Sequence, residues 1–600
     1  MPDDHLHNIR HSFAHVLAAA VLKLFPDAKL GVGPVIDNGC FYDFLLSRPL
    51  SPADLPKIEK EMRKIISRNL PFERQEMTSG KAKMFFADLK QMFKVELIRD
   101  IERYGTTALD NIQRVTHETA EGKETVISLY KTGGFVDLCR GGHVENTNEL
   151  NIDAFKVDRA SGAYWRGSQE REQLQRIYVL AFEKKKDLDA FLKQREEAEK
   201  RDHKKLGTQL DLFVFSEMVG PGLPLWTPKG TLLRNLLDEF VWELRKKAGY
   251  ERVEIPHITK KILYTTSGHW DKFKEELFRI TTREKHEFAM KPMNCPHHTQ
   301  IYARRPWSWR ELPQRYANTT MCYRDEQTGE LSGLTRARSF TQDDAHVFCR
   351  MAQIETELLK IWDIVHSFYG AFGFTLRLRL SLHDPKRPTD YLGDIERWAK
   401  AEAMLRSVAK KKKTPFAEAP GEAAFYGPKL DFLAKDSLGR EWQVATIQLD
   451  MNMPDRFDLT CTAEDGKPER IVMIHAAIMG SLERFLSIII EHYAGAFPLW
   501  LAPVQVAVLP IGKAHKTYAA QIDKALKAAN IRTLLRSDDE TIGKKIRESE
   551  LQKIPHILIM GDKEKSKKTV AVRQRGKGDM GTTKLVKFLK KIGEEVSKKK

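Results

Sequence analysis

Cysteine is scarce in this sequence, and no two cysteines form a C-x-x-C pair. The 600 residues contain six, at positions 40, 139, 295, 322, 349 and 461. Because this spacing matches no disulfide framework, we expect reduced thiols in a cytoplasmic protein. Any functional cysteine must therefore act alone or together with histidines.

Long apolar runs are also missing. The apolar stretch at residues 485–490 ends at Glu491 and His492, far short of the roughly 18 residues that a membrane-spanning helix needs. The first ten residues are polar and lack the apolar stretch of a signal peptide. We therefore expect a soluble, cytoplasmic protein with no membrane partner.

The common nucleotide-binding motifs are absent or incomplete. No G-x-x-x-x-G-K-[ST] occurs, which excludes a P-loop. Residues 576–581 match G-x-G-x-x-G, but only 19 residues follow them. This is too short to complete a βαβ unit with its ribose-binding acid, so the pattern predicts a glycine-rich turn.

The composition is that of a large globular protein. A mass of 69.0 kDa predicts about three or four domains, and 42% hydrophobic with 30% charged residues argues against disorder. The net charge is +17, and residues 501–600 carry 24 basic and 11 acidic residues, which places +13 of it there. Either a polyanionic partner binds this end or the lysines form a solvated surface.

Composition shifts divide the chain. The charged stretch at 183–205 predicts an exposed linker helix, and Pro498 and Pro503 mark a second boundary. The expected domains are 1–182, 206–500 and 501–600. Mixed helices and alternating strands predict an antiparallel sheet in the middle domain, with a surface loop at the lysine run 410–413, and strand–helix alternation predicts a C-terminal α/β domain.

Two histidine-containing pairs stand out in the first domain. His11 and His15 are spaced i, i+4 in a segment that favours helix, so they share a face. Cys139 and His143 form C-x-x-x-H beside glycines that suit a turn. Such a set could bind zinc, or hold a water and a polar substrate. Alternatively, these residues are exposed on the surface and form no site.

Residues 321–349 carry the densest polar pattern. Arg324 follows a first strand, Glu326 lies in a loop, and the predicted second strand carries Arg336, Arg338, Gln342, Asp344 and His346. The last three recur with period two and so share one face, which is costly unless they serve a ligand. An ordinary charged hairpin is the alternative. Further on, His475 precedes a helix whose first turn holds Arg484, which could reach a phosphate.

The chain resembles the bacterial-type threonyl-tRNA synthetases, which are class II aminoacyl-tRNA synthetases. Their catalytic segments resemble MKPMNCPHH, YRDEQTGELSGLTRARSFTQDDAHVFC, AFYGPKLDF and IHAAIMGSLERF. Their editing domain resembles HSFAHVLAAAV and DLCRGGH, and their anticodon-binding domain resembles FPLWLAPVQVAVLPI and KIRESELQKIPHILIMGDKE. The resemblance covers essentially the whole chain. It implies an α+β multidomain fold with an antiparallel catalytic core, an α+β editing domain and an α/β anticodon-binding domain.

The resemblance also implies roles for residues of the middle domain. One zinc ion per chain would be held by Cys295, His346 and His475, with an open position for the amino and hydroxyl groups of threonine. Valine lacks the hydroxyl and would be rejected. From the residues alone, Cys295 is a small buried hydrophobe. The pocket for threonine, ATP and Mg²⁺ would be formed by Arg324, Glu326, Arg336, Gln342, Asp344, Tyr426, Lys429, Gln443, Gln448 and Arg484.

Serine poses a different problem, because a missing methyl group gives only roughly 1–3 kcal/mol of discrimination. A second, hydrolytic site is therefore expected. By resemblance its residues are His11, His15, Tyr42, Lys94, Asp137, Cys139 and His143, and whether it holds a metal is left open. Glu564 and Arg573 match positions that contact the anticodon.

The chain departs from the family pattern at several positions. The family usually has Arg where this chain has Ala476, next to the third zinc ligand, and Pro where it has Gly142. Asp538 and Asp539 stand where Arg and Asn are common. The HSFAH segment begins by His11, so we expect no small N-terminal domain before it.

We therefore expect a homodimeric threonine–tRNA ligase. It would activate L-threonine with ATP to threonyl-adenylate, transfer it to tRNA(Thr), and hydrolyse mischarged seryl-tRNA(Thr). One alternative is a paralogue that edits poorly. Another is a non-catalytic tRNA/RNA-binding or regulatory paralogue on the same scaffold, against which the intact Arg324, Arg484 and zinc ligands argue.

Overall fold

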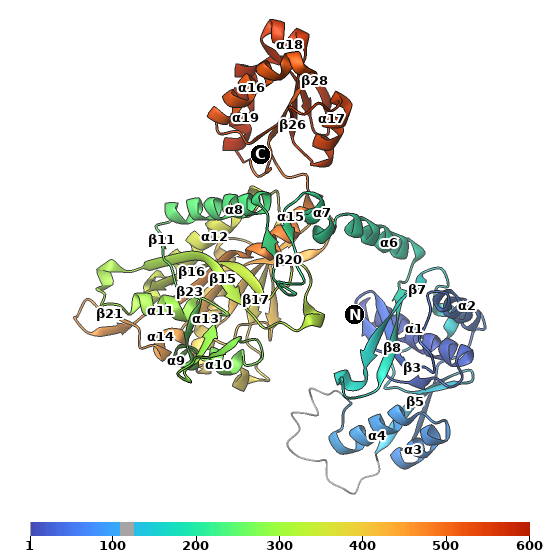
Figure 1. Ribbon diagram of the computed structural model, residues 1–600. Coiled ribbons are helices and arrows are strands. Elements are labelled where there is room, and N and C mark those ends of the chain that lie inside the picture. Colours follow the sequence, from blue (N-terminus) through green and yellow to red (C-terminus); the bar gives the residue numbers. More distant parts are fainter. Residues whose placement is uncertain (1, 108–124, 600) are drawn as a thin grey trace. The chain divides into compact units, whose positions relative to one another are not determined.

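The structure is a computed structural model that describes residues 2–107 and 125–599 of the chain. These residues form two compact units, Met1–Glu196 and Glu197–Lys600 (Figure 1). Within the described part, every helix is too short or too polar to cross a membrane. The finer domain limits expected from the sequence stay predictions.

Helix α1 (Pro2–Leu24) organises the core of the first unit. Phe13, Leu17 and Val21 recur every four residues, share one face and are fully buried. They pack with α2 (Asp54–Ile66) and with a five-stranded antiparallel sheet. A second, three-stranded sheet packs with two further helices. The other main elements of this unit are β3 (Gly39–Leu45), β4 (Glu73–Thr78), α3 (Ser79–Asp88), α4 (Met92–Tyr104), β5 (Val126–Thr132), β6 (Phe135–Leu138), β7 (Phe155–Tyr164) and β8 (Gln173–Ala181).

The charged linker stretch is two helices. They are α6 (Lys185–Lys200) and α7 (His203–Gln209). The Asp202 side chain accepts hydrogen bonds from the backbone of Lys204 and Lys205 and so caps α7. This cap explains why the expected single helix is interrupted.

An eight-stranded sheet forms the centre of the second unit. Its order is β11-β15-β16-β23-β20-β19-β17-β18, and every neighbouring pair except the two outermost is antiparallel. This confirms the antiparallel sheet expected for the middle domain. Its strands are β11 (Glu251–Arg252), β15 (Gln314–Tyr323), β16 (Ser339–Cys349), β17 (Leu376–Leu382), β18 (Phe416–Pro420), β19 (Lys429–Lys435), β20 (Glu441–Asp450) and β23 (Val472–Ser481).

The two faces of this sheet have different roles. Val347 and Ile474 point to one face and are buried in a core shared with helices α8 (Pro228–Lys247), α12 (Ile354–Gly370) and α15 (Leu482–His492) (Figure 1). Because side chains alternate along a strand, His346 and His475 lie on the opposite face. Helix α11 (Cys295–Tyr302) packs against that opposite face.

Two local expectations were wrong. Arg336 and Arg338 precede β16 in a loop, because the pairing of β15 with β16 stops at Tyr323 and Ser339. The lysine run 410–413 is not wholly a loop, since α13 (Ile395–Lys411) extends into it. Lysine favours helix and its charge suits the C-terminal turn, so the helix continues.

The C-terminal part is an α/β fold, as expected. Its sheet has the order β25-β24-β26-β27-β28, with the first three strands parallel and the last two antiparallel. The glycine-rich pattern begins in the turn between β27 and β28 and continues into β28, and Gly576 and Gly578 both have φ +75°. The elements are β24 (Val506–Pro510), α16 (Lys516–Ala528), β25 (Thr533–Leu535), α17 (Ile542–Leu551), β26 (His556–Met560), α18 (Asp562–Lys567), β27 (Thr569–Gln574), β28 (Gly578–Lys584) and α19 (Leu585–Ser597).

Candidate functional site

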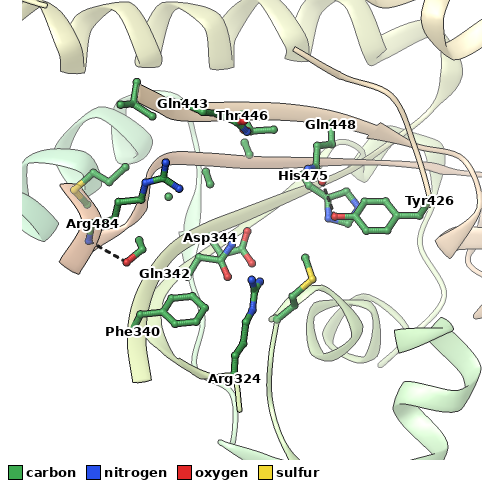
Figure 2. A pocket seen from close by; sticks show the side chains of 17 residues that line it. Arg324, Phe340, Gln342, Asp344, Tyr426, Gln443, Thr446, Gln448, His475 and Arg484 are labelled. Carbon is green, nitrogen blue, oxygen red and sulfur yellow. Dashed lines mark hydrogen bonds between the residues drawn. The ribbon is translucent and has the colours of Figure 1, made fainter. Parts of the chain in front are cut away.

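A cavity of about 350 Å³ opens on the polar face of the eight-stranded sheet (Figure 2). Strands β16, β20 and β23 form its floor, and the start of α15 closes one end. It brings together eight residues expected from the sequence: Arg324, Gln342, Asp344, Tyr426, Gln443, Gln448, His475 and Arg484. Phe340 and Thr446 also line it and were missed by the sequence analysis.

Two arginines point into this cavity from different elements (Figure 2). Arg324 follows β15, and its closest carboxylate in the described chain is Glu276, 3.9 Å away. Arg484 lies in the first turn of α15, where its backbone N–H is bonded to the Ser481 side chain. Within the described residues, no carboxylate lies within 4 Å of the Arg484 guanidinium. Burial lowers the pKa of Arg484, and a bound anion would relieve this cost.

Hydrogen-bonding side chains gather at the other end of the cavity. The Tyr426 hydroxyl donates to Gln448 at 2.6 Å, and its ring stacks on His475 with centroids 4.9 Å apart. The Asn294 amide donates to Asp344 at 3.2 Å. Burial raises the pKa of the Asp344 carboxyl. This end can therefore bind a small polar molecule by several groups at once.

A candidate metal site adjoins the cavity. Cys295, His346 and His475 each offer one ligand atom, and these atoms lie within 4.8 Å of one another. All three side chains are buried. His346 Nε2 lies 3.1 Å from His475 Nδ1, so these nitrogens face the same point. Burial raises the pKa of the Cys295 thiol and lowers the pKa of His346. A bound metal ion would instead lower the pKa of the thiol.

Three residues behind these ligands were missed by the sequence analysis. Asp450 Oδ2 lies 2.9 Å from His475 Nε2, and His298 Nδ1 lies 2.7 Å from His346 Nδ1. His269 Nε2 lies 3.7 Å from the Cys295 sulfur. Such partners fix the ring orientation of ligating histidines. No sequence pattern points to these three residues, because their positions depend on contacts between distant segments.

The remaining expected residues lie close to the cavity without lining it. Glu326 pairs with Arg336 at 2.6 Å, and this ion pair joins the two ends of the β15–β16 loop. Lys429 Nζ lies 3.4 Å from buried Asp431. Asp431 also accepts from the Gln443 amide at 2.8 Å. Glu326 and Arg336 therefore lie in the β15–β16 loop, which borders the pocket.

The histidine–cysteine set of the first unit is assembled in space. His11, His15, Cys139 and His143 place ligand-type atoms within 4.8 Å of one another. The Cys139 sulfur lies 3.2 Å from His143 Nε2 and 3.5 Å from His11 Nε2. Burial raises the pKa of Cys139 to about 11 and lowers that of His143 to about 2, so the thiol is protonated and the imidazole neutral.

This set borders a second cavity, of about 570 Å³, in the first unit, and a buried triad of Tyr42, Lys94 and Asp137 lines the same cavity. Lys94 Nζ lies 2.7 Å from Asp137 and 2.9 Å from the Tyr42 hydroxyl. The Tyr42 hydroxyl donates to the other oxygen of Asp137. Ser12, which the sequence analysis missed, lies 3.2 Å from His143 Nδ1 and accepts a hydrogen bond from the backbone of Val144.

The two expected anticodon residues lie on neighbouring elements of the C-terminal fold. Glu564 is in the first turn of α18 and accepts a hydrogen bond from the backbone of Gly561. Arg573 is on β27, 3.5 Å from Glu550. Asp538 and Asp539 are paired with Arg536 and Lys516.

Three segments of the chain match described families. Residues 127–178 match the "Threonyl and Alanyl tRNA synthetase second additional domain", and residues 278–493 match the "tRNA synthetase class II core domain (G, H, P, S and T)". Residues 505–595 match the "Anticodon binding domain".

Relatives match over nearly the full length. The threonine–tRNA ligase of Acetivibrio thermocellus is 46% identical over 590 residues, which is 98% of this chain and 88% of the relative. That of Gloeobacter violaceus is 45% identical over 603 residues, 99% of this chain and 93% of the relative. A solved structure titled as the RNA-binding domain of the Cryptosporidium parvum threonyl-tRNA synthetase aligns at 38% identity with a TM-score of 0.63, over 66% of this chain and 98% of that one.

The polar pocket on the eight-stranded sheet, the histidine–cysteine site of the first unit and the full-length matches are consistent with one another. They do not favour a non-catalytic paralogue. The chain belongs to the threonine–tRNA ligase family of class II aminoacyl-tRNA synthetases, with a class II core, an anticodon-binding domain and an editing domain.

Proposed function

We propose that the pocket of Figure 2 activates L-threonine with ATP and that the histidine–cysteine site removes serine errors. The observation that carries the first part is the buried set of Cys295, His346 and His475 beside a cavity lined by two arginines. One end of the cavity suits an amino acid with a hydroxyl group, and the other suits phosphates.

The donor set fits zinc. One thiolate and two imidazoles are borderline-soft ligands of the kind zinc prefers, and three protein ligands are typical of catalytic sites. Asp450 supports this assignment, because a carboxylate on the far nitrogen of His475 favours the tautomer that presents Nδ1 as a ligand. When bound, zinc would supply a Lewis-acidic position for the amino and hydroxyl groups of the substrate.

The protein's own side chains would then orient the reactants. Asp344 and Tyr426 would bind the amino or hydroxyl group of threonine, which valine cannot fully replace. Arg324 and Arg484 would bind ATP phosphates, and Mg²⁺ would enter with those phosphates. The other pocket residues would position the adenylate: Glu326, Arg336, Gln342, Lys429, Gln443 and Gln448.

The second site would hydrolyse seryl-tRNA(Thr). Neutral imidazoles and a protonated thiol can hold a water and a hydroxyl-bearing substrate without forming a thiolate nucleophile. Lys94, whose charge is balanced by Asp137, presents an ammonium hydrogen-bond donor at the cavity wall. It would donate a hydrogen bond to the bound substrate.

The remaining assignments complete the proposal. The basic domain at 501–600 would bind the anticodon stem of tRNA(Thr), with Glu564 and Arg573 contacting bases. The domain limits would be 182, 205 and 500, and the chain would act as a cytoplasmic homodimer. All six cysteines are free and buried.

Zinc content and threonine-dependent ATP–pyrophosphate exchange test the first site. Cys295→Ala should lose about one zinc per chain and threonine activation together. Cys349→Ala is the matched control, because Cys349 is equally buried but lies on the far end of β16, outside the ligand set. A Cys295→Ala enzyme that activates threonine normally would refute the role of the metal.

Deacylation of seryl-tRNA(Thr) tests the second site. His11→Ala combined with Cys139→Ala should leave threonine charging intact while seryl-tRNA accumulates. Cys40→Ala provides the control, since Cys40 is buried in the core of the same unit and belongs to neither cluster. Undiminished hydrolysis by the double variant would place editing elsewhere.

A further inference from the structure

A buried carboxylate fills an irregularity between the two strands that carry the metal-ligating histidines. The register of β16 and β23 shifts between the pairs Gln342↔Ser481 and Asp344↔Ala477, so three residues of β23 oppose the single residue Asp343. The backbone N–H groups freed there need acceptors. Asp343 supplies them: its carboxylate accepts from the backbone of residues 478 and 479 at 3.1 and 2.9 Å.

One arginine from a neighbouring helix completes this arrangement. Arg245, near the end of α8, donates from Nη2 to the Asp343 carboxylate at 3.2 Å and to the Asp343 carbonyl at 3.2 Å. The same nitrogen lies 3.3 Å from the carbonyl of Ala476 on β23. Arg245 is 2% exposed and Asp343 is fully buried. In the described chain, Arg245 is the only cation within 4 Å of this carboxylate.

Ala476 lies beside the Arg245 guanidinium, on the same face of the sheet as Asp343. Ala476 pairs across the strands with Ala345, so it shares a face with Asp343, two residues away from that pairing. Diagonal neighbours of this kind are within reach of long side chains. At this position the chain carries only a methyl group. The guanidinium of Arg245 occupies the space beside it.

The ion pair between Arg245 and Asp343 lies next to the proposed metal ligands. His346 and His475 are direct cross-strand partners, one residue from the Ala345–Ala476 pair on each strand. We propose that Arg245 is a positioning residue for the metal site: from α8 it bonds to both strands and so holds β16 and β23 in the register that brings His346 and His475 together. This inference rests on the proposed metal site.

A transposed arginine gives the decisive test. The full-length chain is loaded with zinc, and the zinc dissociation constant is measured by competition with a chelator. Arg245→Leu should weaken zinc binding roughly tenfold or more, the loss typical when a supporting partner of a metal ligand is removed. Adding Ala476→Arg to that variant should restore zinc affinity to within about threefold of the wild type, because the new side chain reaches Asp343 from the other strand.

A matched ion pair separates positioning from general stability. Arg315 on β15 pairs with buried Glu357 of α12 at 2.5 and 2.8 Å and touches neither β23 nor the metal ligands. Arg315→Leu should lower the thermal unfolding midpoint and leave zinc affinity unchanged in the folded protein.

The outcomes are distinct. If the wild type binds no zinc, or Cys295→Ala binds it normally, the proposed metal site itself fails. If that site holds but folded Arg245→Leu binds zinc as the wild type does, or Ala476→Arg gives no recovery, the role of Arg245 is wrong. If Arg245→Leu does not fold, the double variant decides: a folded, zinc-binding double variant supports the proposal and an unfolded one overturns it.

Discussion

Single residues behind the proposed metal ligands should set how tightly that site holds an ion. Asp450 fixes the His475 ring from the side away from the site. We predict that Asp450→Asn lowers zinc affinity about 10–100-fold, because the amide can no longer favour the ligating tautomer. Chelator competition measures this. Asp458→Asn, at an exposed ion pair with Arg470, should have no effect, and an unchanged affinity in Asp450→Asn would contradict the assignment.

The histidine cluster of the first unit predicts a pH dependence. The pKa of His143 is lowered to about 2, first by burial and then by His15 and His11, whereas an unfolded histidine titrates near pH 6.5. Below about pH 6.5 the unfolded chain binds protons that the folded unit does not. The free energy of unfolding of this unit should therefore fall as the pH drops from 6.5.

Hydrogen exchange in the full-length chain measures this effect. Protection factors in α1, corrected for the intrinsic effect of pH on exchange, should decrease between pH 7 and pH 5. His143→Gln should reduce the decrease. Equal decreases in both proteins would show that His143 does not contribute.

Residues that line the pocket or could bind a metal were easier to predict from the sequence than the buried residues that hold them in place. Gln342, Asp344 and His346 were found because period two is visible in one strand, and the structure has them on the polar face of β16. The roles of Cys295 and His475 came only through family resemblance. Asp450 and His298 could not be found, since a buried residue that contacts a distant ligand has no sequence pattern of its own.

At the scale of elements, the cap of α15 links helix stability to the pocket. The Ser481 hydroxyl accepts the backbone N–H of Arg484. Ser481→Ala should cost about 1 kcal/mol in urea unfolding and also raise the KM for ATP, because Arg484 lies in the uncapped turn. Thr541→Ala removes an equivalent cap from α17, outside the catalytic pocket, and should cost similar stability with an unchanged KM. Equal effects on KM would argue against the link.

Elements with strong periodicity were predictable, and their ends were not. The apolar spacing of α8 and α12 and the alternation of β17 and β20 all gave the correct element type. The loop before β16 was misplaced, because arginine in a loop and arginine in a strand look alike in sequence. The β16–β23 irregularity at Asp343 was also invisible, since it arises only when the two strands pair.

At the scale of the whole molecule, the basic C-terminal domain should control tRNA affinity. Removing residues 504–600 should weaken tRNA binding, flatten its salt dependence and leave threonine activation nearly intact. Each lost phosphate contact removes roughly 0.7–0.9 from the slope of log affinity against log salt, the range between single-stranded and duplex nucleic acid. The cut follows Pro503 because Leu501 is fully buried in the catalytic core. An unchanged slope in filter-binding measurements would show that the basic residues form a solvated surface and do not contact tRNA phosphates.

Arg573 should act differently within that domain. Arg573→Ala should lower discrimination among anticodons more than overall tRNA affinity, because base contacts specify and phosphate contacts position. Aminoacylation of tRNA transcripts with altered anticodons measures this. A uniform loss across all anticodons would assign Arg573 to the backbone instead.

The central claim is that one pocket activates threonine and leaves the rejection of serine to a second site. ATP–pyrophosphate exchange by the zinc-loaded, full-length chain with threonine, serine and valine tests it most directly. The account predicts strong exchange with threonine, measurable exchange with serine, and almost none with valine. Exchange with valine comparable to that with threonine, or none with threonine, would contradict it.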